Sequence, residues 1–168
     1  MDAMKLKYAK SGTRVLEDER GKIILQKDKN VAVVLLAKDG DSLILIRQYR
    51  QAVDDYVIQL PGGGVESGED IEEAVRREFY EETGYRCGSV QYIGYMYPAN
   101  WISNELTHLF FTQEIIDQSD QKLDVNEKIQ VHKISITACM DMIRSSEIHD
   151  SELSYALLHA ILKGLIRI

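Results

Sequence analysis

The stretch LPGGGVESGEDIEEAVRREFYEETGY, residues 60–85, decides the fold of this chain. It opens at the end of an apolar run that is typical of a strand. Three consecutive glycines, Gly62–Gly64, follow. Glycine adopts backbone angles that other residues avoid, so the chain can turn sharply here and leave its amide and carbonyl groups accessible.

A helix is predicted directly after this turn. Ser67 has the character of an N-cap, and Asp70 stands three residues further on as its capping-box partner. We therefore expect the helix to run from about Glu69 to Thr83. Gly84 fits the position just past the helix end, where glycine commonly ends a helix.

The charges on this helix fall in an unusual place. At 100° per residue its apolar sector consists of Ile71, Ala74, Val75 and Phe79. The carboxylates of Glu78, Glu81 and Glu82 share that sector in the C-terminal half of the helix. Carboxylates on a buried face need partners, and their helical spacing brings their oxygens together. A hard divalent cation, Mg²⁺ or Mn²⁺, meets both requirements.

Arg77 lies beside these carboxylates, and its forked guanidinium can hold one of them in place. The alternative interpretation is an ordinary solvated acidic helix, which describes Glu72 and Glu73 well.

These residues resemble the Nudix hydrolase family, whose pattern is G-x5-E-x7-R-E-U-x-E-E-x-G-U, with U a bulky aliphatic residue. The pattern is met by Gly63, Glu69, Arg77, Glu78, Phe79, Glu81, Glu82 and Gly84, with aromatic residues at the U positions Phe79 and Tyr85. The resemblance implies a metal-dependent hydrolase that cleaves a diphosphate linked to another group.

The resemblance also implies roles for individual residues. The metal ligands it implies are the carbonyl of Gly62 and the carboxylates of Glu78, Glu81 and Glu82. Glu69 and Arg77 are expected to pair and to orient these ligands.

The whole chain sets limits on the class of protein. With 168 residues it forms one domain, or one domain with a short arm, and its net charge is −7, from 27 acidic and 20 basic residues. That balance argues against a general nucleic-acid or anionic-membrane surface. Cys87 and Cys139 show no metal-ligand spacing and fit a reducing compartment. The start of the chain has no apolar signal core, so we expect a cytoplasmic protein.

The rest of the sequence predicts a mixed sheet with helices on both sides, an α/β/α sandwich. Residues 1–30 form a short N-terminal β-hairpin arm and residues 31–168 the hydrolase domain. The predicted strands are Thr13–Leu16, Lys22–Gln26, 31–37, Ser42–Arg50, Tyr56–Leu60, Val90–Tyr97, Leu106–Glu114 and Ile129–Ile134. A polar loop is predicted at Asp117–Lys128, and helices at Thr137–Ser145 and Ser151–Leu165.

Beyond the helix, the chain is similar to the branch of the family that contains ADP-ribose pyrophosphatases and other nucleoside-diphosphate-sugar hydrolases. The similarity includes Arg47–Arg50 and the N-terminal hairpin, which in that branch helps to form a homodimer. By position, Arg50 would contact substrate phosphate or ribose; the alternative is a surface cation at a strand end. Glu127 lies in an acidic loop and is a candidate general base, as are Glu81 and Glu82; the alternative is an ordinary loop glutamate.

Three residues depart from that branch. Gln59 stands where Glu is common, and Asn100 where Pro is common. Trp101 replaces a small residue and either stacks on a substrate base or anchors its loop. We expect hydrolysis of ADP-ribose, or of a related nucleoside diphosphate sugar, to AMP and ribose 5-phosphate. The alternatives are a Nudix hydrolase of nucleoside triphosphates and a module that senses nucleotides without hydrolysing them.

Overall fold

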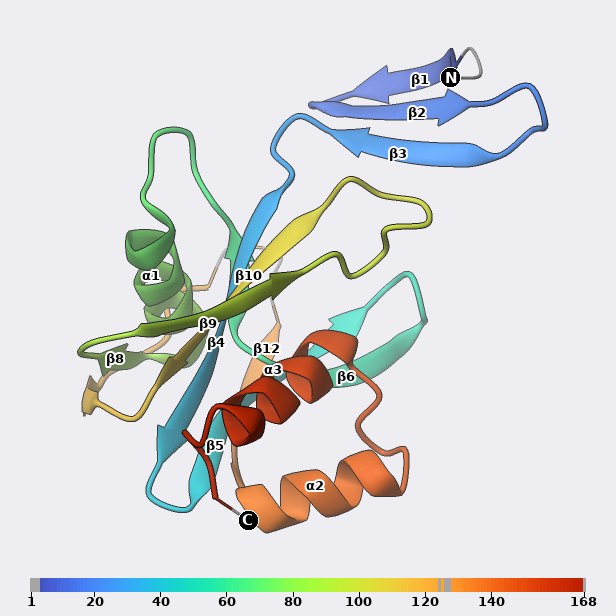
Figure 1. Cartoon of the computed structure of the whole chain (residues 1–168). Helices are drawn as coiled ribbons and strands as arrows, with labels where there is room; N and C mark the ends of the chain where they lie inside the picture. The colour runs from blue at the N-terminus through green and yellow to red at the C-terminus, as the bar shows by residue number, and fades with distance from the viewer. Residues whose placement is uncertain (1–3, 124, 126–127, 168) are drawn as a thin grey trace.

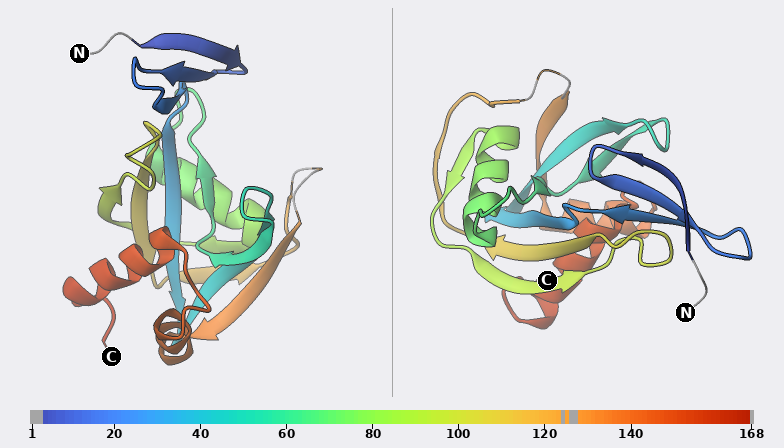
Figure 2. Two further views of the ribbon diagram at one scale, coloured as in Figure 1. Left: turned by 90° about the vertical axis from the view of Figure 1, so that its right-hand side faces the viewer. Right: turned by 90° about the horizontal axis from the view of Figure 1, so that it is seen from above.

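The computed structural model describes residues 4–123, 125 and 128–167. A mixed seven-stranded sheet is covered on one face by α1 (Ile71–Thr83) and on the other by α2 (Ile136–Arg144) and α3 (Ser151–Leu162) (Figures 1 and 2). The strands of this sheet are β4 (Val31–Asp39), β5 (Ser42–Arg50), β6 (Asp55–Gln59), β7 (Gly62–Gly64), β9 (Gln91–Met96), β10 (Leu106–Thr112) and β12 (Ile129–Ser135). The predicted α/β/α sandwich is confirmed.

The central strand β4 explains why its sequence is a continuous apolar run. Val33 and Leu35 pack on the face that carries α1, whereas Val34 and Leu36 pack on the face that carries α2 and α3. A strand that is buried on both faces does not need to alternate apolar and polar residues. The two apolar clusters on either side of β4 therefore form the core of the sandwich.

One edge of β4 is shared between two strands. β4 runs parallel to β10 along residues 31–37, and on its other edge it pairs with β7 at residues 32–34 and with β5 only at residues 37–39. The second half of β5 pairs instead with β6, at residues 46–50, while β12 pairs with β5 along residues 42–48. The glycine strand β7 thus pairs with the part of β4 with which β5 does not pair. The candidate site lies beside this junction.

The N-terminal arm has one strand more than predicted. β2 (Thr13–Glu17) and β3 (Ile23–Lys27) form the predicted hairpin, and β1 (Lys5–Lys10) pairs along the free edge of β2. All residues of β1 are exposed, so its sequence carries no core-facing apolar pattern that would reveal a strand. The arm projects from the sandwich and continues directly into β4 (Figures 1 and 2).

The arm is tied to the sandwich through Asn104. Its side chain accepts a hydrogen bond from Lys27 N at 2.8 Å and donates one to Lys27 O at 3.0 Å. Leu25 N also donates to Ile102 O at 2.6 Å. The loop 98–105 thereby continues the pairing of β3 where the arm leaves the sandwich.

Other boundaries differ from prediction at the ends of elements. The strand β10 ends at Thr112, two residues before the predicted end. A further strand, β11 (Ile115–Gln118), includes the first two residues of the loop predicted from Asp117. β11 pairs with β8 (Tyr85–Cys87), which directly follows α1 and was also not predicted. Both strands are too short for a recognisable two-residue periodicity. In the described part of the chain, no helix has the length and apolar character needed to cross a membrane.

Candidate functional site

The helix α1 begins later than predicted. Asp70, and not Ser67, is the N-cap: its backbone is extended and its carboxylate accepts a hydrogen bond from Glu72 N at 2.8 Å. The predicted capping box is therefore wrong. The turn before the helix includes Gly68 in a left-handed conformation, and it places Asp70 next to the backbone N–H groups of the first helical turn, which lack a partner within the helix. Gly84 ends the helix as predicted, with φ 74° and its N–H bonded to Tyr80 O.

Two glycines of β7 allow the chain to pass close to its neighbours. A Cβ on Gly62 would lie 2.1 Å from Val33 O, so this residue has no space for a side chain beside β4. A Cβ on Gly63 would lie 2.6 Å from the carboxylate of Glu78. The glycine at position 63 therefore makes room for a carboxylate of α1 against the backbone of β7.

Arg77 organises the acidic side chains around it. Its Nε and Nη2 donate to the two oxygens of Glu69 at 2.7 and 2.9 Å, a bidentate pair. Its Nη1 donates to Glu78 at 2.8 Å and to Glu81 at 3.1 Å, and Nη2 also reaches Gly64 O at 3.1 Å. The predicted pairing of Arg77 with Glu69 is thus present, and it ties α1 to the loop before it and to β7.

The pair also changes the acidity of both groups. The hydrogen bonds from Arg77 hold the pKa of Glu69 below its ordinary value, and Glu69 is the main cause that raises the pKa of Arg77. Both groups therefore remain charged across the neutral pH range.

Glu82 is the most buried of the three candidate ligands, with 5% of its surface exposed. Its Oε2 accepts a hydrogen bond from Gly62 N at 2.7 Å. This bond fixes the end of α1 against the start of the glycine strand. Glu78, one turn earlier, lies against Gly63 of β7, and Glu81 is linked to Glu78 through Arg77.

A polar cavity of about 440 Å³ lies between these elements. Its lining residues come from β5, the glycine segment, α1 and the loop after β11: Gln48, Arg50, Gly62, Gly63, Gly64, Glu66, Arg77, Glu78, Glu81, Glu82 and Lys122. The structure therefore brings Arg50 together with every predicted metal ligand. Lys122 was not singled out from the sequence, because its place depends on how a polar loop folds back onto α1.

Arg50 reaches the cavity from the end of β5. Its Nε donates to Oε1 of Gln59 at 2.8 Å, and Gln59, on the neighbouring strand β6, is only 7% exposed. A neutral amide therefore orients the guanidinium. Trp101 is 67% exposed, lies in the loop that contacts the arm, and is not part of the cavity wall. Glu127 lies outside the described residues.

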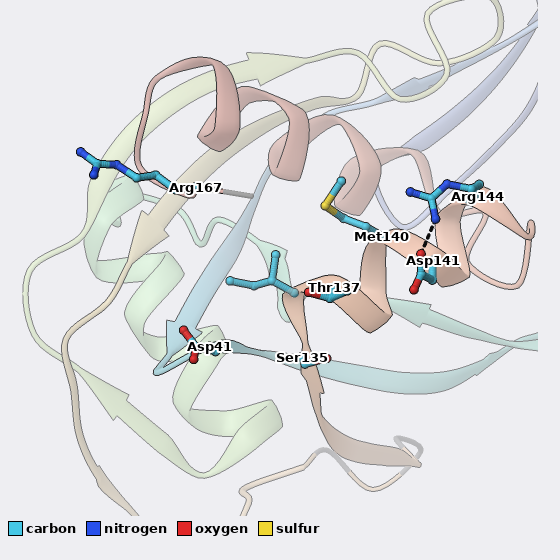
Figure 3. A pocket seen from close by; sticks show the side chains of 8 residues that line it. Asp41, Ser135, Thr137, Met140, Asp141, Arg144 and Arg167 are labelled. Carbon is cyan, nitrogen blue, oxygen red and sulfur yellow. Dashed lines mark hydrogen bonds and ion pairs between the residues drawn. The ribbon is translucent and has the colours of Figure 1, made fainter.

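A second cavity of similar size, about 410 Å³, lies far from these carboxylates. It surrounds the start of α2, and Asp41 and Ser135 line it at the opposite ends of β5 and β12 from the candidate site (Figure 3). Its charged side chains include the ion pair of Asp141 with Arg144. Its only acidic lining residues in the described part of the chain are Asp41 and Asp141, so the first cavity, with its four glutamates, is the better candidate site.

The donor set of the first cavity fits a hard divalent cation. Carboxylate oxygens and a backbone carbonyl, here those of Gly62, Glu78, Glu81 and Glu82, are the ligands that Mg²⁺ and Mn²⁺ prefer. In the described part of the chain no three acidic, His or Cys side chains converge closely enough to hold a cation as they stand. Arg77 Nη1 donates a hydrogen bond to both Glu78 and Glu81.

Two known proteins that are similar to this chain are named as pyrophosphatases. An ADP-ribose pyrophosphatase of Bacillus subtilis (strain 168) is 27% identical over 142 residues, which cover 84% of this chain and 77% of that protein. A GDP-mannose pyrophosphatase of Cronobacter sakazakii (strain ATCC BAA-894) is 26% identical over 151 residues, 85% of this chain and 78% of that protein.

A solved structure described as an ADP compounds hydrolase shares the fold. It superimposes with a TM-score of 0.77 over 99% of this chain and 95% of that chain, at 21% identity. The model of the NUDIX domain matches residues 26–139, which contain the glycine strand, α1 and every residue of the carboxylate cluster. The chain therefore belongs to the Nudix family and is a Nudix pyrophosphohydrolase.

Proposed function

We propose that this enzyme hydrolyses the diphosphate bond of a nucleoside diphosphate sugar, with ADP-ribose as the first substrate to test, in the presence of Mg²⁺ or Mn²⁺. The observation that carries this proposal is that Arg50 and the carboxylates of Glu78, Glu81 and Glu82 line one cavity. Relatives named for ADP-ribose and GDP-mannose hydrolysis support the substrate class.

The protein residues divide the work between ligation and substrate binding. Glu78, Glu81, Glu82 and the carbonyl of Gly62 would hold the divalent cation, which would supply positive charge for the diphosphate and lower the pKa of a bound water. Arg50, oriented by Gln59, binds a phosphate or ribose oxygen through its guanidinium fork. A carboxylate accepts the proton of the attacking water as the oxygen–phosphorus bond forms and the anhydride bond breaks.

The proton acceptor is either Glu127, from its position in the acidic loop, or one of the carboxylates Glu81 and Glu82. With ADP-ribose the products are AMP and ribose 5-phosphate. Trp101 remains a candidate for stacking on the substrate base, and its large exposed ring supports this role.

A panel of substrates tests the proposal. We would measure kcat/KM for ADP-ribose, ADP-glucose, GDP-mannose and dGTP with Mg²⁺ and with Mn²⁺, since that ratio measures discrimination. A preference for one of the three sugar nucleotides is expected. A tenfold or greater preference for dGTP would favour the triphosphate alternative and overturn the substrate class. Tight binding of ADP-ribose without product release would favour the sensing module.

We also propose that the enzyme is a homodimer, with the arm of residues 1–30 at its interface and residues 31–168 as the hydrolase domain. Two observations support this. Met4, Leu6 and Tyr8 expose large apolar surface on the arm. Residues 1–30 hold eight basic and five acidic side chains, while the whole chain has a net charge of −7, so a cationic arm extends from an acidic domain.

Light scattering at micromolar concentration tests the dimer. The intact chain is expected to be dimeric, and a chain without residues 1–30 monomeric. An intact monomer, or a dimer that survives the deletion, would overturn the proposed interface. We also propose that the enzyme acts in the cytoplasm, where the thiols of Cys87 and Cys139 would stay reduced.

A further inference from the structure

The loop after β11 is held against the C-terminal end of α1. The last carbonyls of a helix have no partner within the helix and must find one elsewhere. Here Lys122 N donates to Glu81 O at 2.8 Å, and Ser119 N donates to Gly84 O at 2.9 Å. The side-chain amide of Gln121 donates to Glu82 O as well. Residues 119–122, which follow α1 by more than thirty residues in the sequence, thus cap the C-terminal end of α1. These hydrogen bonds fix their position relative to that helix.

This docking brings the side chain of Lys122 into the wall of the cavity that Glu78, Glu81 and Glu82 line. Its Nζ lies 5.1 Å from the centre of the Tyr80 ring, within the range of a cation–π contact. The guanidinium of Arg86 lies 4.8 Å from the same ring centre, and Ser119 Oγ donates to Tyr80 Oη at 3.2 Å. Tyr80 therefore joins the docked loop to α1 and directs the stem of Lys122.

The cations of the cavity are not equivalent. Arg77 already forms ion pairs with Glu69, Glu78 and Glu81. Arg50 and Lys122 also line the cavity, and no ion pair within 4.0 Å joins either of them to a carboxylate of the described residues. Burial raises the pKa of the carboxyls of Asp150 and Glu152, and Arg50 lies close enough to both to oppose that rise. The two cations come from separate segments of the chain, and both face the space that an anionic ligand would occupy.

We propose that Lys122 is a second phosphate-binding residue of the site, in addition to Arg50, and that Tyr80 is the residue that positions it. This inference rests on the proposed function, because it takes the ligand to be a nucleotide with a diphosphate group. An ammonium is a compact charge that binds phosphate oxygens without the fixed geometry of a guanidinium fork. Lys122 would thus attract and hold the anionic substrate while the carboxylates hold the cation.

The main test is Lys122→Met, which keeps the length of the side chain and removes its charge. KM for the preferred sugar nucleotide is expected to rise about tenfold with kcat nearly unchanged, as for loss of a binding contact. Lys122→Arg is expected to restore most of the affinity. The matched control is Lys163→Met, an exposed lysine at the end of α3, which changes the net charge equally and leaves the kinetics unchanged.

Two further measurements separate binding from general electrostatics. Raising the ionic strength should increase KM of the wild-type enzyme more steeply than that of Lys122→Met, because one screened contact is already lost. Tyr80→Phe should keep the wild-type KM, whereas Tyr80→Leu should raise it about threefold without changing kcat, since only the ring supports the ammonium. Equal KM values and equal salt dependence in Lys122→Met and wild type would overturn the proposal, as would a fall in kcat alone.

Failure of the proposed function would be visible separately. If the wild-type enzyme releases no product from any sugar nucleotide, the substrate class is wrong, and Lys122 is then tested by equilibrium titration with ADP. A dissociation constant about tenfold weaker in Lys122→Met than in wild type would support a phosphate contact. Identical dissociation constants would overturn it.

Discussion

Arg50 and Gln59 form a hydrogen bond of 2.8 Å between neighbouring strands, in which the guanidinium Nε donates to a buried neutral amide oxygen. The amide orients Arg50 without neutralising its charge. A carboxylate at position 59 would keep the hydrogen bond and add an ion pair that competes with the substrate phosphate. The neutral partner therefore orients Arg50 toward the cavity without adding an ion pair at position 59.

This relationship predicts the effect of changing Gln59. Gln59→Leu is expected to raise KM for the preferred substrate about tenfold with little change in kcat, since a hydrogen bond to a charged group contributes about 1.5 kcal/mol. Gln59→Glu should have a smaller effect, because it keeps an acceptor for Arg50. Steady-state kinetics of both variants provide the measurement. A wild-type KM in Gln59→Leu would show that Arg50 needs no such support.

The two glycines Gly63 and Gly64 give a matched pair of substitutions. A Cβ at position 63 would displace the carboxylate of Glu78, whereas a Cβ at position 64 would meet nothing within 4 Å, and neither residue has a positive φ. We expect Gly63→Ala to lower kcat at least ~100-fold, because a small misplacement of a catalytic group has effects of that order. Gly64→Ala should retain near wild-type kinetics and melting temperature. Equal activity in the two variants would contradict the close packing of Glu78 against β7.

Glu82→Gln tests ligation apart from folding. The glutamine amide oxygen can still accept the hydrogen bond from Gly62 N, so we expect little change in melting temperature. Loss of the charged ligand is expected to lower kcat at least ~100-fold at saturating Mg²⁺. Near-normal turnover would mean that Glu82 has a structural role alone, as the anchor of the glycine strand.

The pair of Glu69 with Arg77 predicts a dependence of stability on pH. The pKa of Glu69 is lowered in the folded state, so the ion pair stabilises the protein above the pKa of an unfolded glutamate, about 4.3, and this contribution is lost as the pH falls further. The melting temperature of Glu69→Gln should therefore be lower than that of the wild type at neutral pH. The difference between the two melting temperatures should become smaller in acid. Glu19→Gln, in an exposed turn of the arm, is the control. A difference that stays constant from neutral pH to pH about 3 would contradict the linkage.

Glu127→Gln tests the proposed proton acceptor. If Glu127 takes the proton of the attacking water, the substitution should lower kcat, leave KM largely intact and change the acidic limb of the pH–rate profile. Profiles of wild type and variant recorded from about pH 6 to about pH 9 provide the comparison. Superimposable profiles would leave Glu81 and Glu82 as the candidates.

The sequence predicted helix α1 and the pairing of Arg77 with Glu69 because their geometry is local. Arg77, Glu78 and Glu81 lie on neighbouring turns of one helix and Glu69 lies just before it, so the spacing along the chain brings these four side chains together. Lys122 escaped prediction because a polar loop has no periodicity, and its place is set by hydrogen bonds to carbonyls at the end of α1. Strand β1 was not predicted, because an edge strand that is exposed on both faces needs no apolar pattern. The N-cap was misplaced by three residues and the helix start by two, since Ser67 and Asp70 are equally good caps by type.

The hydrogen bonds of Arg77 have a consequence for how the substrate preference of such an enzyme can evolve. In the described part of the chain these hydrogen bonds end within residues 64–81, and the proposed metal ligands all lie within residues 62–82, one continuous segment. The cations proposed to recognise the substrate, Arg50 and Lys122, stand on segments outside it. Substitutions that alter which nucleotide is accepted can therefore accumulate without passing through inactive intermediates. A library that randomises Gln48, Gln59 and Lys122 while keeping residues 62–84 constant should yield changed preferences at a much higher frequency than one directed at the helix.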